Sequence, residues 1–174
     1  MRMKFIAPAL TSSALALSAF AGGLGTDYCF GVGCPCGNDD PLAGCATSTG
    51  SGASLEAFGS TSVSENLLGF EATNVPQNKV GLLVMGSVAV NEPLRDGLRC
   101  FGGTIQRFWK HKNSGQSGVL RYESVISDWA EVSNVHLTAG DTRFFQVWFR
   151  DSGNGSPCGL KANLTHGVEL TFTP

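Results

Sequence analysis

The chain has 174 residues, a formal net charge of −2, and only 15% of its residues are charged. Its basic residues are scattered, with Lys110-His111-Lys112 as the one cluster, whereas phosphate binding needs a concentrated basic face. We therefore expect no nucleic-acid partner. The length suits a single domain with a hydrophobic core of its own.

The N-terminus predicts a secretory signal peptide over residues 1–21. Two basic residues among the first four precede a mostly apolar run from Phe5 to Phe20, which ends at the small-x-small site Ala19-Phe20-Ala21. This run is too short and too interrupted for a stable membrane span, and no later segment is long enough for one. The mature chain, from residue 22, is expected to be secreted and extracellular and to have no membrane span.

The six cysteines are expected to form disulfides. An exported chain meets an oxidising environment in which thiols pair, and the number of cysteines is even. The Cys34-Pro35-Cys36 spacing matches neither the Cys-x-x-Cys of thiol exchange nor a zinc site, and no histidine lies nearby. We therefore predict no metal and no cofactor. The cysteines are Cys29, Cys34, Cys36, Cys45, Cys100 and Cys158.

The four clustered cysteines allow three pairings, and sequence alone does not choose between them. A strand-like Cys-Pro-Cys points its two sulfurs apart, so Cys34 and Cys36 are not expected to pair with each other. Two bridges within the cluster would pin the N-terminal segment mainly to itself. The pairing we favour is Cys29–Cys36, Cys34–Cys45 and Cys100–Cys158.

The remaining chain predicts short β-strands. Short apolar stretches bounded by turn residues recur along a chain with 23 glycines, and no segment sustains the 3.6-residue period of an amphipathic helix. In chain order, the expected strands are residues 53–57, 68–72, 80–90 with a break or bend at Gly86, 104–109, 119–126, 132–137, 142–150 and 167–172.

These strands predict an all-β fold, an antiparallel β-sandwich or jelly roll with a disulfide-rich N-terminal segment, because about eight to ten short strands suit such an architecture. Residues 22–52 form the Cys-rich segment and a Gly/Ser linker in this prediction. Residues 53–174 form the β-sandwich domain.

Several motifs resemble those of a family of secreted, Gly-rich domains common in environmental bacteria. They are "CPCGNDDPLAGCATSTGSGASLEAFG", "DGLRCFGGTIQR", "FFQVWFRD" and "NLTHGVELTFTP", and they extend over nearly all the mature chain. His166 departs from the family pattern, which has Asn in Asn-Leu-Thr-Asn-Gly. The family carries no assigned activity, so the resemblance implies extracellular location and architecture and no particular chemistry.

No catalytic motif is found in the sequence. Neither "GSTSVS" nor "NSGQSG" matches the Gly-x-Ser-x-Gly of a nucleophile elbow, and the three histidines share no metal-ligand spacing. A glycosidase needs two carboxylates across a cleft, and Glu123 and Asp128 are near enough in sequence to lie close together. Asn38-Asp39-Asp40 offers oxygen ligands for calcium, but turn chemistry explains the triplet without an ion.

The strand at residues 142–150 carries the strongest candidate binding surface. Period-two alternation places Phe145, Val147 and Phe149 on the core face. The other face then carries Phe144, Gln146, Trp148 and Arg150. Arg107 and Trp109, on a strand expected to lie beside it, extend this surface. Flat aromatic side chains beside hydrogen-bonding groups suit sugar rings.

The same alternation is also compatible with a central strand that is buried on both faces. In that case Trp148 packs beneath a loop and Arg150 pairs with Asp151 or Asp96.

Three hypotheses follow for function, because fold-level likeness does not determine function. The first is a non-catalytic extracellular or cell-surface module for attachment or recognition, with a polysaccharide or a surface protein as partner. The second is a carbohydrate-binding module that uses the aromatic strand face. The third is a secreted hydrolase with an unrecognised site.

Overall fold

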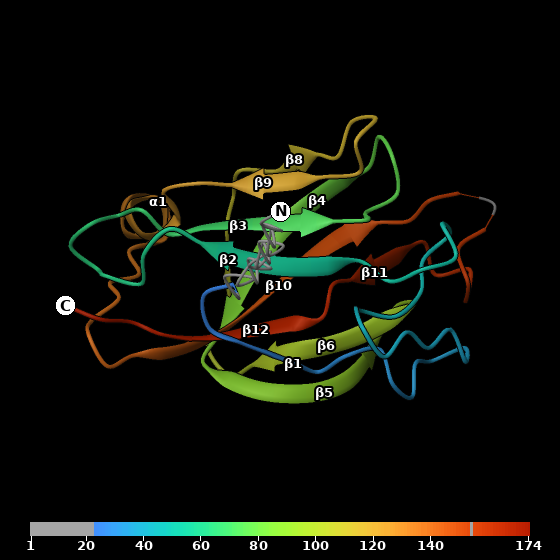
Figure 1. Ribbon diagram of the computed structural model, residues 1–174, viewed down its shortest axis with the longest axis horizontal. Coiled ribbons are helices and arrows are strands. Elements are labelled where there is room, and N and C mark those ends of the chain that lie inside the picture. Colours follow the sequence, from blue (N-terminus) through green and yellow to red (C-terminus); the bar gives the residue numbers. More distant parts are fainter. Residues whose placement is uncertain (1–22, 154) are drawn as a thin grey trace, which may run out of the picture.

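The computed structural model describes residues 23–153 and 155–174 (Figure 1). These residues form twelve β-strands and one α-helix, α1 (Val125–Ser133), and the strands pair in antiparallel sheets. The prediction of an all-β, sandwich-like fold is therefore confirmed. In the described part of the chain, no helix combines the length and the apolar character needed to cross a membrane. The predicted signal peptide lies outside the described residues.

The largest sheet has seven strands, and β10 lies at its centre. Its members, in order, are β1 (Thr26–Tyr28), β12 (Gly167–Thr171), β10 (Thr142–Arg150), β4 (Val80–Gly86) and β7 (Gln106–Arg107), with β11 (Ala162–Leu164) beside β10 and β8 (Lys112–Asn113) beside β4. The aromatic and β-branched residues of β10 suit a pleated central strand, and its predicted bounds are correct. As alternation predicts, Phe145, Val147 and Phe149 are fully buried on one face.

A second layer covers this face and completes the sandwich. The layer consists of α1 and of the sheet β2 (Ser54–Phe58), β3 (Gly69–Thr73) and β9 (Leu120–Tyr122). The ring centroid of Phe145 lies 4.6 Å from that of Phe70 and 5.8 Å from that of Trp129. Burying side chains of this size contributes roughly 1.5–3 kcal/mol each. The main hydrophobic core therefore lies between the two sheets.

The opposite face of the large sheet is covered only in part, by the hairpin β5 (Val88–Leu94) and β6 (Gly97–Gly102). Phe101 of β6 packs with Leu82, Val84 and Leu164 in a smaller apolar cluster. The outer strand β5 is mostly exposed. Part of the second face of the sheet thus stays uncovered beside the hairpin.

The predicted strand at 119–126 is correct only over residues 120–122, and the predicted strand at 132–137 is wrong. The structure has the short strand β9, then α1, then a loop. Val125 and Trp129, four residues apart on α1, are buried in the main core. The N–H of Asn134, in a left-handed conformation with φ 50°, donates to the carbonyl of Trp129 and ends the helix. A helix of nine residues is too short for its period to stand out in the sequence.

Apart from β10, the other predicted strands recur with shifted ends. The run 80–90 divides at Gly86 into β4 and β5, and 104–109 shrinks to the two residues of β7. Four strands are not predicted from the sequence: β1, β6, β8 and β11. Three of these have only two or three residues, too few to show an alternating pattern.

Each of the three disulfides includes at least one cysteine of the N-terminal segment. Two of the predicted pairs are wrong. Cys34–Cys45 forms as predicted, whereas Cys29 pairs with Cys100 and Cys36 pairs with Cys158. The hydroxyl of Tyr28 donates to the carbonyl of Cys100 at 2.7 Å, which brings the end of β1 against β6. Sequence spacing carries no information about such contacts between distant segments. The Cys-rich segment is therefore fastened to the sandwich at two points.

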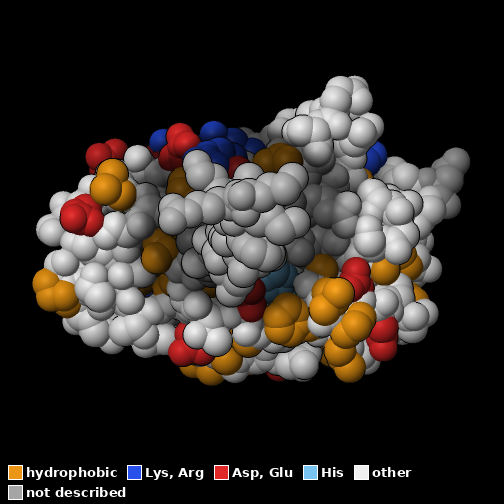
Figure 2. Space-filling view, viewed as in Figure 1, with side chains coloured by type: hydrophobic (Ala, Val, Ile, Leu, Met, Phe, Trp, Pro, Cys, Tyr) orange, Lys and Arg blue, Asp and Glu red, His pale blue; other side chains and the backbone are white. Residues whose placement is uncertain are grey.

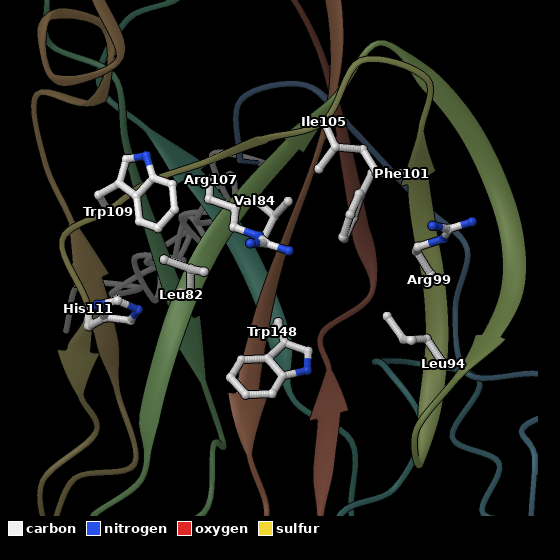
Figure 3. A pocket seen from close by; sticks show the side chains of 10 residues that line it. All are labelled: Leu82, Val84, Leu94, Arg99, Phe101, Ile105, Arg107, Trp109, His111 and Trp148. Carbon is white, nitrogen blue, oxygen red and sulfur yellow. The ribbon is translucent and has the colours of Figure 1, made fainter. Parts of the chain in front are cut away.

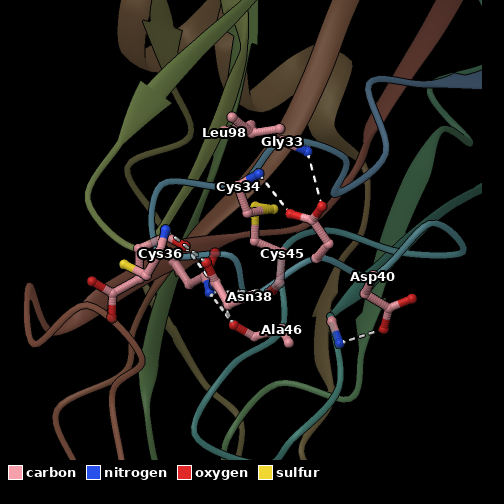
Figure 4. Close-up of a disulfide and its surroundings, with 12 residues drawn as sticks. Gly33, Cys34, Cys36, Asn38, Asp40, Cys45, Ala46 and Leu98 are labelled. Carbon is pink, nitrogen blue, oxygen red and sulfur yellow. Dashed lines mark hydrogen bonds between the residues drawn. A yellow bond between two sulfur atoms is a disulfide. The ribbon is translucent and has the colours of Figure 1, made fainter.

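The Asn38-Asp39-Asp40 triplet holds the backbone of this segment (Figure 4). Asp39 accepts a hydrogen bond from the N–H of Cys34 at 2.7 Å, and Asp40 accepts one from the N–H of Gly52 at 2.8 Å. The Asn38 amide donates to the carbonyls of Ala46 and Asp96, both at 2.8 Å. Only the hydrogen bond from the N–H of Leu42 to Asp40, at 3.1 Å, is the local turn contact that the triplet predicts, and the others fasten this segment to itself and to Asp96 before β6.

The bridge between Cys36 and Cys158 should be reduced first, because Cys36 is exposed whereas Cys34, Cys45 and Cys100 are buried. Mild reduction of the folded protein followed by alkylation and peptide mapping should label Cys36 and Cys158 ahead of the other four cysteines. In denaturant the six should label together. Earlier labelling of Cys29 and Cys100 in the folded protein would contradict this order.

Candidate functional site

A groove with a volume of 360 Å³ lies on the partly covered face of the large sheet, beside the β5–β6 hairpin (Figure 3). We refer to it as the hairpin groove. Its lining residues are Leu82, Val84, Leu94, Arg99, Phe101, Ile105, Arg107, Trp109, His111 and Trp148.

The floor of the hairpin groove is built from neighbouring strands of the sheet. Trp148 of β10 lies opposite Leu82 of β4, and Val84 lies opposite Arg107 of β7. Because side chains alternate along each strand, these residues point to the face that the main core does not use. In Figure 3 the Arg107 guanidinium lies near the middle of the lining residues.

Two walls rise from this floor. The hairpin supplies one wall with Leu94, Arg99 and Phe101, and the segment after β6 supplies the other with Trp109 and His111. Trp109 is 54% exposed, an unusual position for the largest apolar side chain. Its indole therefore offers an aromatic surface to a molecule in the hairpin groove.

At Gly86 the backbone of the sheet lies directly against the backbone of the hairpin at Gly102. A Cβ atom at Gly86 would lie 2.6 Å from the carbonyl oxygen and 2.8 Å from the nitrogen of Gly102. Such contacts are too short for any side chain, so both the turn out of β4 and the close approach of β6 depend on Gly86. The N–H of Ser87 donates to the Gly102 carbonyl at 3.0 Å and fixes this junction.

The side chain of Gln146 joins β10 to the hairpin. It is fully buried, and its Oε1 accepts a hydrogen bond from the N–H of Cys100 at 2.8 Å. Its Nε2 donates to the carbonyls of Leu98 at 2.9 Å and Thr165 at 2.6 Å. Three backbone groups that would otherwise be buried without partners are satisfied by one amide. The position of the hairpin wall is thus set by hydrogen bonds as well as by apolar packing.

The hairpin groove is apolar with a basic margin. Among the described residues that line it, none is acidic. Arg99 forms an ion pair with Glu92 on the exposed strand β5, and in Figure 3 its guanidinium points toward that strand. Arg107 forms no ion pair within the described residues. The field inside the hairpin groove therefore favours negative charge.

The structure brings together three of the six predicted ligand-binding residues. Trp148, Arg107 and Trp109 line the hairpin groove, although β4 separates the strand of Arg107 from β10. Arg150 is exposed, and its guanidinium lies 5.7 Å from the centre of the Trp148 ring. It extends the basic margin of the hairpin groove next to Trp148.

The other two predicted ligand-binding residues are structural. Gln146 is occupied by the backbone of β6, and Phe144 packs edge-on against Tyr28 with their ring centroids 5.7 Å apart. Burial, more than the charge of Glu169, raises the pKa of Tyr28, so its phenol stays a neutral hydrogen-bond donor. Neither Gln146 nor Phe144 is in position to contact a ligand in the hairpin groove.

The expected pairing of Arg150 with Asp151 or Asp96 is not formed. Both carboxylates are fully buried and accept hydrogen bonds from serine hydroxyls, Asp151 from Ser48 and Asp96 from Ser156. These contacts hold the Cys-rich segment and the loop before β11 to the sandwich. Arg150 is thereby left to lie over Trp148.

The hairpin residues of the groove were not among the predicted site residues. The available signal was the Asp96-Gly97 dipeptide between apolar stretches, which is typical of a hairpin turn, although the turn itself is Arg95-Asp96, between the paired residues Leu94 and Gly97. It predicts a hairpin over the region of β5 and β6 but not the sheet face on which this hairpin lies. Arg99 and Phe101 become wall residues only through that placement.

Residue clusters suited to metal binding are absent from the part of the chain that the structure describes. His111 lines the hairpin groove, His136 is exposed, and His166 is buried against Phe30 with the ring centroids 5.2 Å apart. Burial lowers the pKa of His166 more than the charge of Asp27 raises it, so the ring is neutral at neutral pH. The three histidines therefore do not converge on one site.

Comparison with family models, curated proteins and solved structures found no match to this chain. The resemblance to the secreted Gly-rich domains therefore stays a prediction from the sequence motifs.

Replacing Gln146 with Leu should lower the free energy of unfolding by roughly 2–4 kcal/mol, because the N–H of Cys100 and two carbonyls lose their buried partner. Denaturant unfolding followed by tryptophan fluorescence measures this change. Gln116→Leu is the matched control; it changes an exposed glutamine and should stay within about 0.5 kcal/mol of the wild type. Equal stability of the two variants would show that the amide does not hold the hairpin.

Proposed function

We propose that this chain is a non-catalytic extracellular module that recognises carbohydrate through the hairpin groove. The observation that carries the proposal is the arrangement of two tryptophans around a guanidinium, with Trp148 on the floor, Trp109 on the wall and Arg107 between them (Figure 3).

The chemistry of sugar rings supports this choice of ligand. A pyranose has an apolar face that stacks on aromatic side chains and a rim of hydroxyls that accept hydrogen bonds from donors such as Arg107. The groove volume of 360 Å³ falls in the range of about 300–1,000 Å³ that is usual for small-ligand sites. Ionic and aromatic side chains thus flank an opening of suitable size.

The disulfides support the extracellular location. Three bridges in a chain of this length are typical of proteins that fold in oxidising compartments. The basic and apolar N-terminus of the sequence suits export, and the resemblance to secreted Gly-rich domains suggests the same location. On the face drawn in Figure 2, the basic side chains at the upper edge have acidic neighbours, so this face carries no concentrated basic patch there.

Trp109→Ala should weaken carbohydrate binding by at least about tenfold, since central aromatic residues dominate many binding sites. A glycan array should first identify a bound oligosaccharide, and isothermal titration calorimetry with that oligosaccharide then compares the variants. Trp109 is 54% exposed, so its removal should leave the fold intact.

Leu42→Ala is the control, because Leu42 is 82% exposed and lies outside the hairpin groove. It should bind as the wild type does. Two results would contradict a carbohydrate site in this groove. One is that the wild-type protein binds no glycan on the array, and the other is that Trp109→Ala binds as tightly as the wild type.

A further inference from the structure

We infer that the hairpin groove selects acidic polysaccharides, whose sugars carry carboxylates, over neutral ones. This inference rests on the proposed function and names the class of carbohydrate. The observation behind it is the charge of the groove, in which cationic side chains lie beside aromatic ones and the described lining residues include no carboxylate.

Arg107 is placed to receive a carboxylate. Its backbone is held against β4 by pairing with Val84 and by the hydrogen bond from the N–H of Phe108 to the carbonyl of Leu83 at 2.8 Å. Its side chain forms no ion pair within the described residues, in contrast to Arg121 and Arg143, which pair with nearby carboxylates. A guanidinium with free N–H groups binds a carboxylate through two parallel hydrogen bonds.

Arg99 lines the opposite wall of the hairpin groove, but its guanidinium is turned toward Glu92 on β5, so it can meet a ligand only by leaving this ion pair. Its partner, Glu92, lies on the exposed strand β5, and the side chains are 32% and 55% exposed. An exposed ion pair of this kind contributes little to stability. A ligand carboxylate is therefore able to compete with Glu92 for the guanidinium at small cost.

The aromatic side chains determine how a chain of acidic sugars would lie. Trp109 and Trp148 offer apolar surfaces on either side of Arg107, and Arg150 lies over Trp148 at the margin. A uronate polysaccharide repeats one apolar ring face and one carboxylate per sugar, which matches this alternation of indole and guanidinium. A neutral sugar would stack on the indoles but would leave the guanidinium of Arg107 without a charged partner.

The central comparison in the test is between a uronate hexamer and its neutral methyl ester. Calorimetry measures the affinity of the protein for galacturonate and mannuronate hexamers, for the methyl ester of the galacturonate hexamer, for a sulfated hexasaccharide and for decanoate. We expect the galacturonate hexamer to bind about tenfold or more tightly than its neutral methyl ester, because only the acid pairs with Arg107.

Substitutions of single arginines test whether the preference for acidic sugars depends on Arg107. Arg107→Gln should weaken uronate binding by about tenfold more than it weakens binding of the ester, because the glutamine amide still donates to sugar hydroxyls but carries no charge for the carboxylate. Arg121→Gln is the control, since it removes an equal charge from the opposite layer of the sandwich and should leave both affinities within about twofold of wild type. Circular dichroism checks that each variant is folded.

The outcomes separate the two proposals. Equal affinity for the uronate hexamer and its methyl ester would overturn the selectivity for acidic sugars and leave the carbohydrate site standing. Tighter binding of the sulfated hexasaccharide than of both uronates would overturn the assignment to carboxylates. Binding of decanoate with no binding of any oligosaccharide would overturn the carbohydrate site itself.

Discussion

The side chain of Gln146 determines how far the β5–β6 hairpin stands from the large sheet. Its hydrogen bonds to Cys100 and Leu98 cross from β10 to β6 of the hairpin, and its hydrogen bond to Thr165 holds the turn between β11 and β12. A buried amide that leaves no partner unsatisfied specifies a single arrangement of the surrounding chains. The glycine contact at Gly86 places the start of the same hairpin. Together these contacts leave a strip of the sheet uncovered, and this strip is the floor of the hairpin groove.

The disulfides reinforce this arrangement from the outer side. Cys100, whose N–H is bound by Gln146, is also bridged to Cys29 at the end of β1. Cys36–Cys158 joins the same N-terminal segment to the loop before β11. Loop closure in the unfolded chain becomes less favourable as the loop grows, so bridges across 71 and 122 residues restrict the unfolded state more than one across 11. The hairpin wall is therefore covalently tied to the domain.

Side-chain alternation and turn residues predicted the fold class and part of the site, because both depend only on neighbouring residues within one strand or turn. Alternation along β10 correctly separated Phe145 from Trp148, and the aromatic and β-branched residues predicted that this segment is a strand. Sequence reasoning failed where distant segments meet. Gln146 looked like an exposed ligand residue because the hairpin that buries it lies more than forty residues earlier, as the separation of 46 from Cys100 shows. The disulfide pairs and the groove wall at Arg99 depend on the same long-range placement.

The central claim is that a sugar chain lies in the hairpin groove between Trp109 and Trp148, with its charge on Arg107. A crystal structure of the protein with a bound uronate hexamer tests it most directly. The account predicts sugar rings stacked on these indoles and a carboxylate within hydrogen-bond distance of the Arg107 guanidinium. A hexamer bound on the other layer of the sandwich, or rings that touch neither tryptophan, would contradict it.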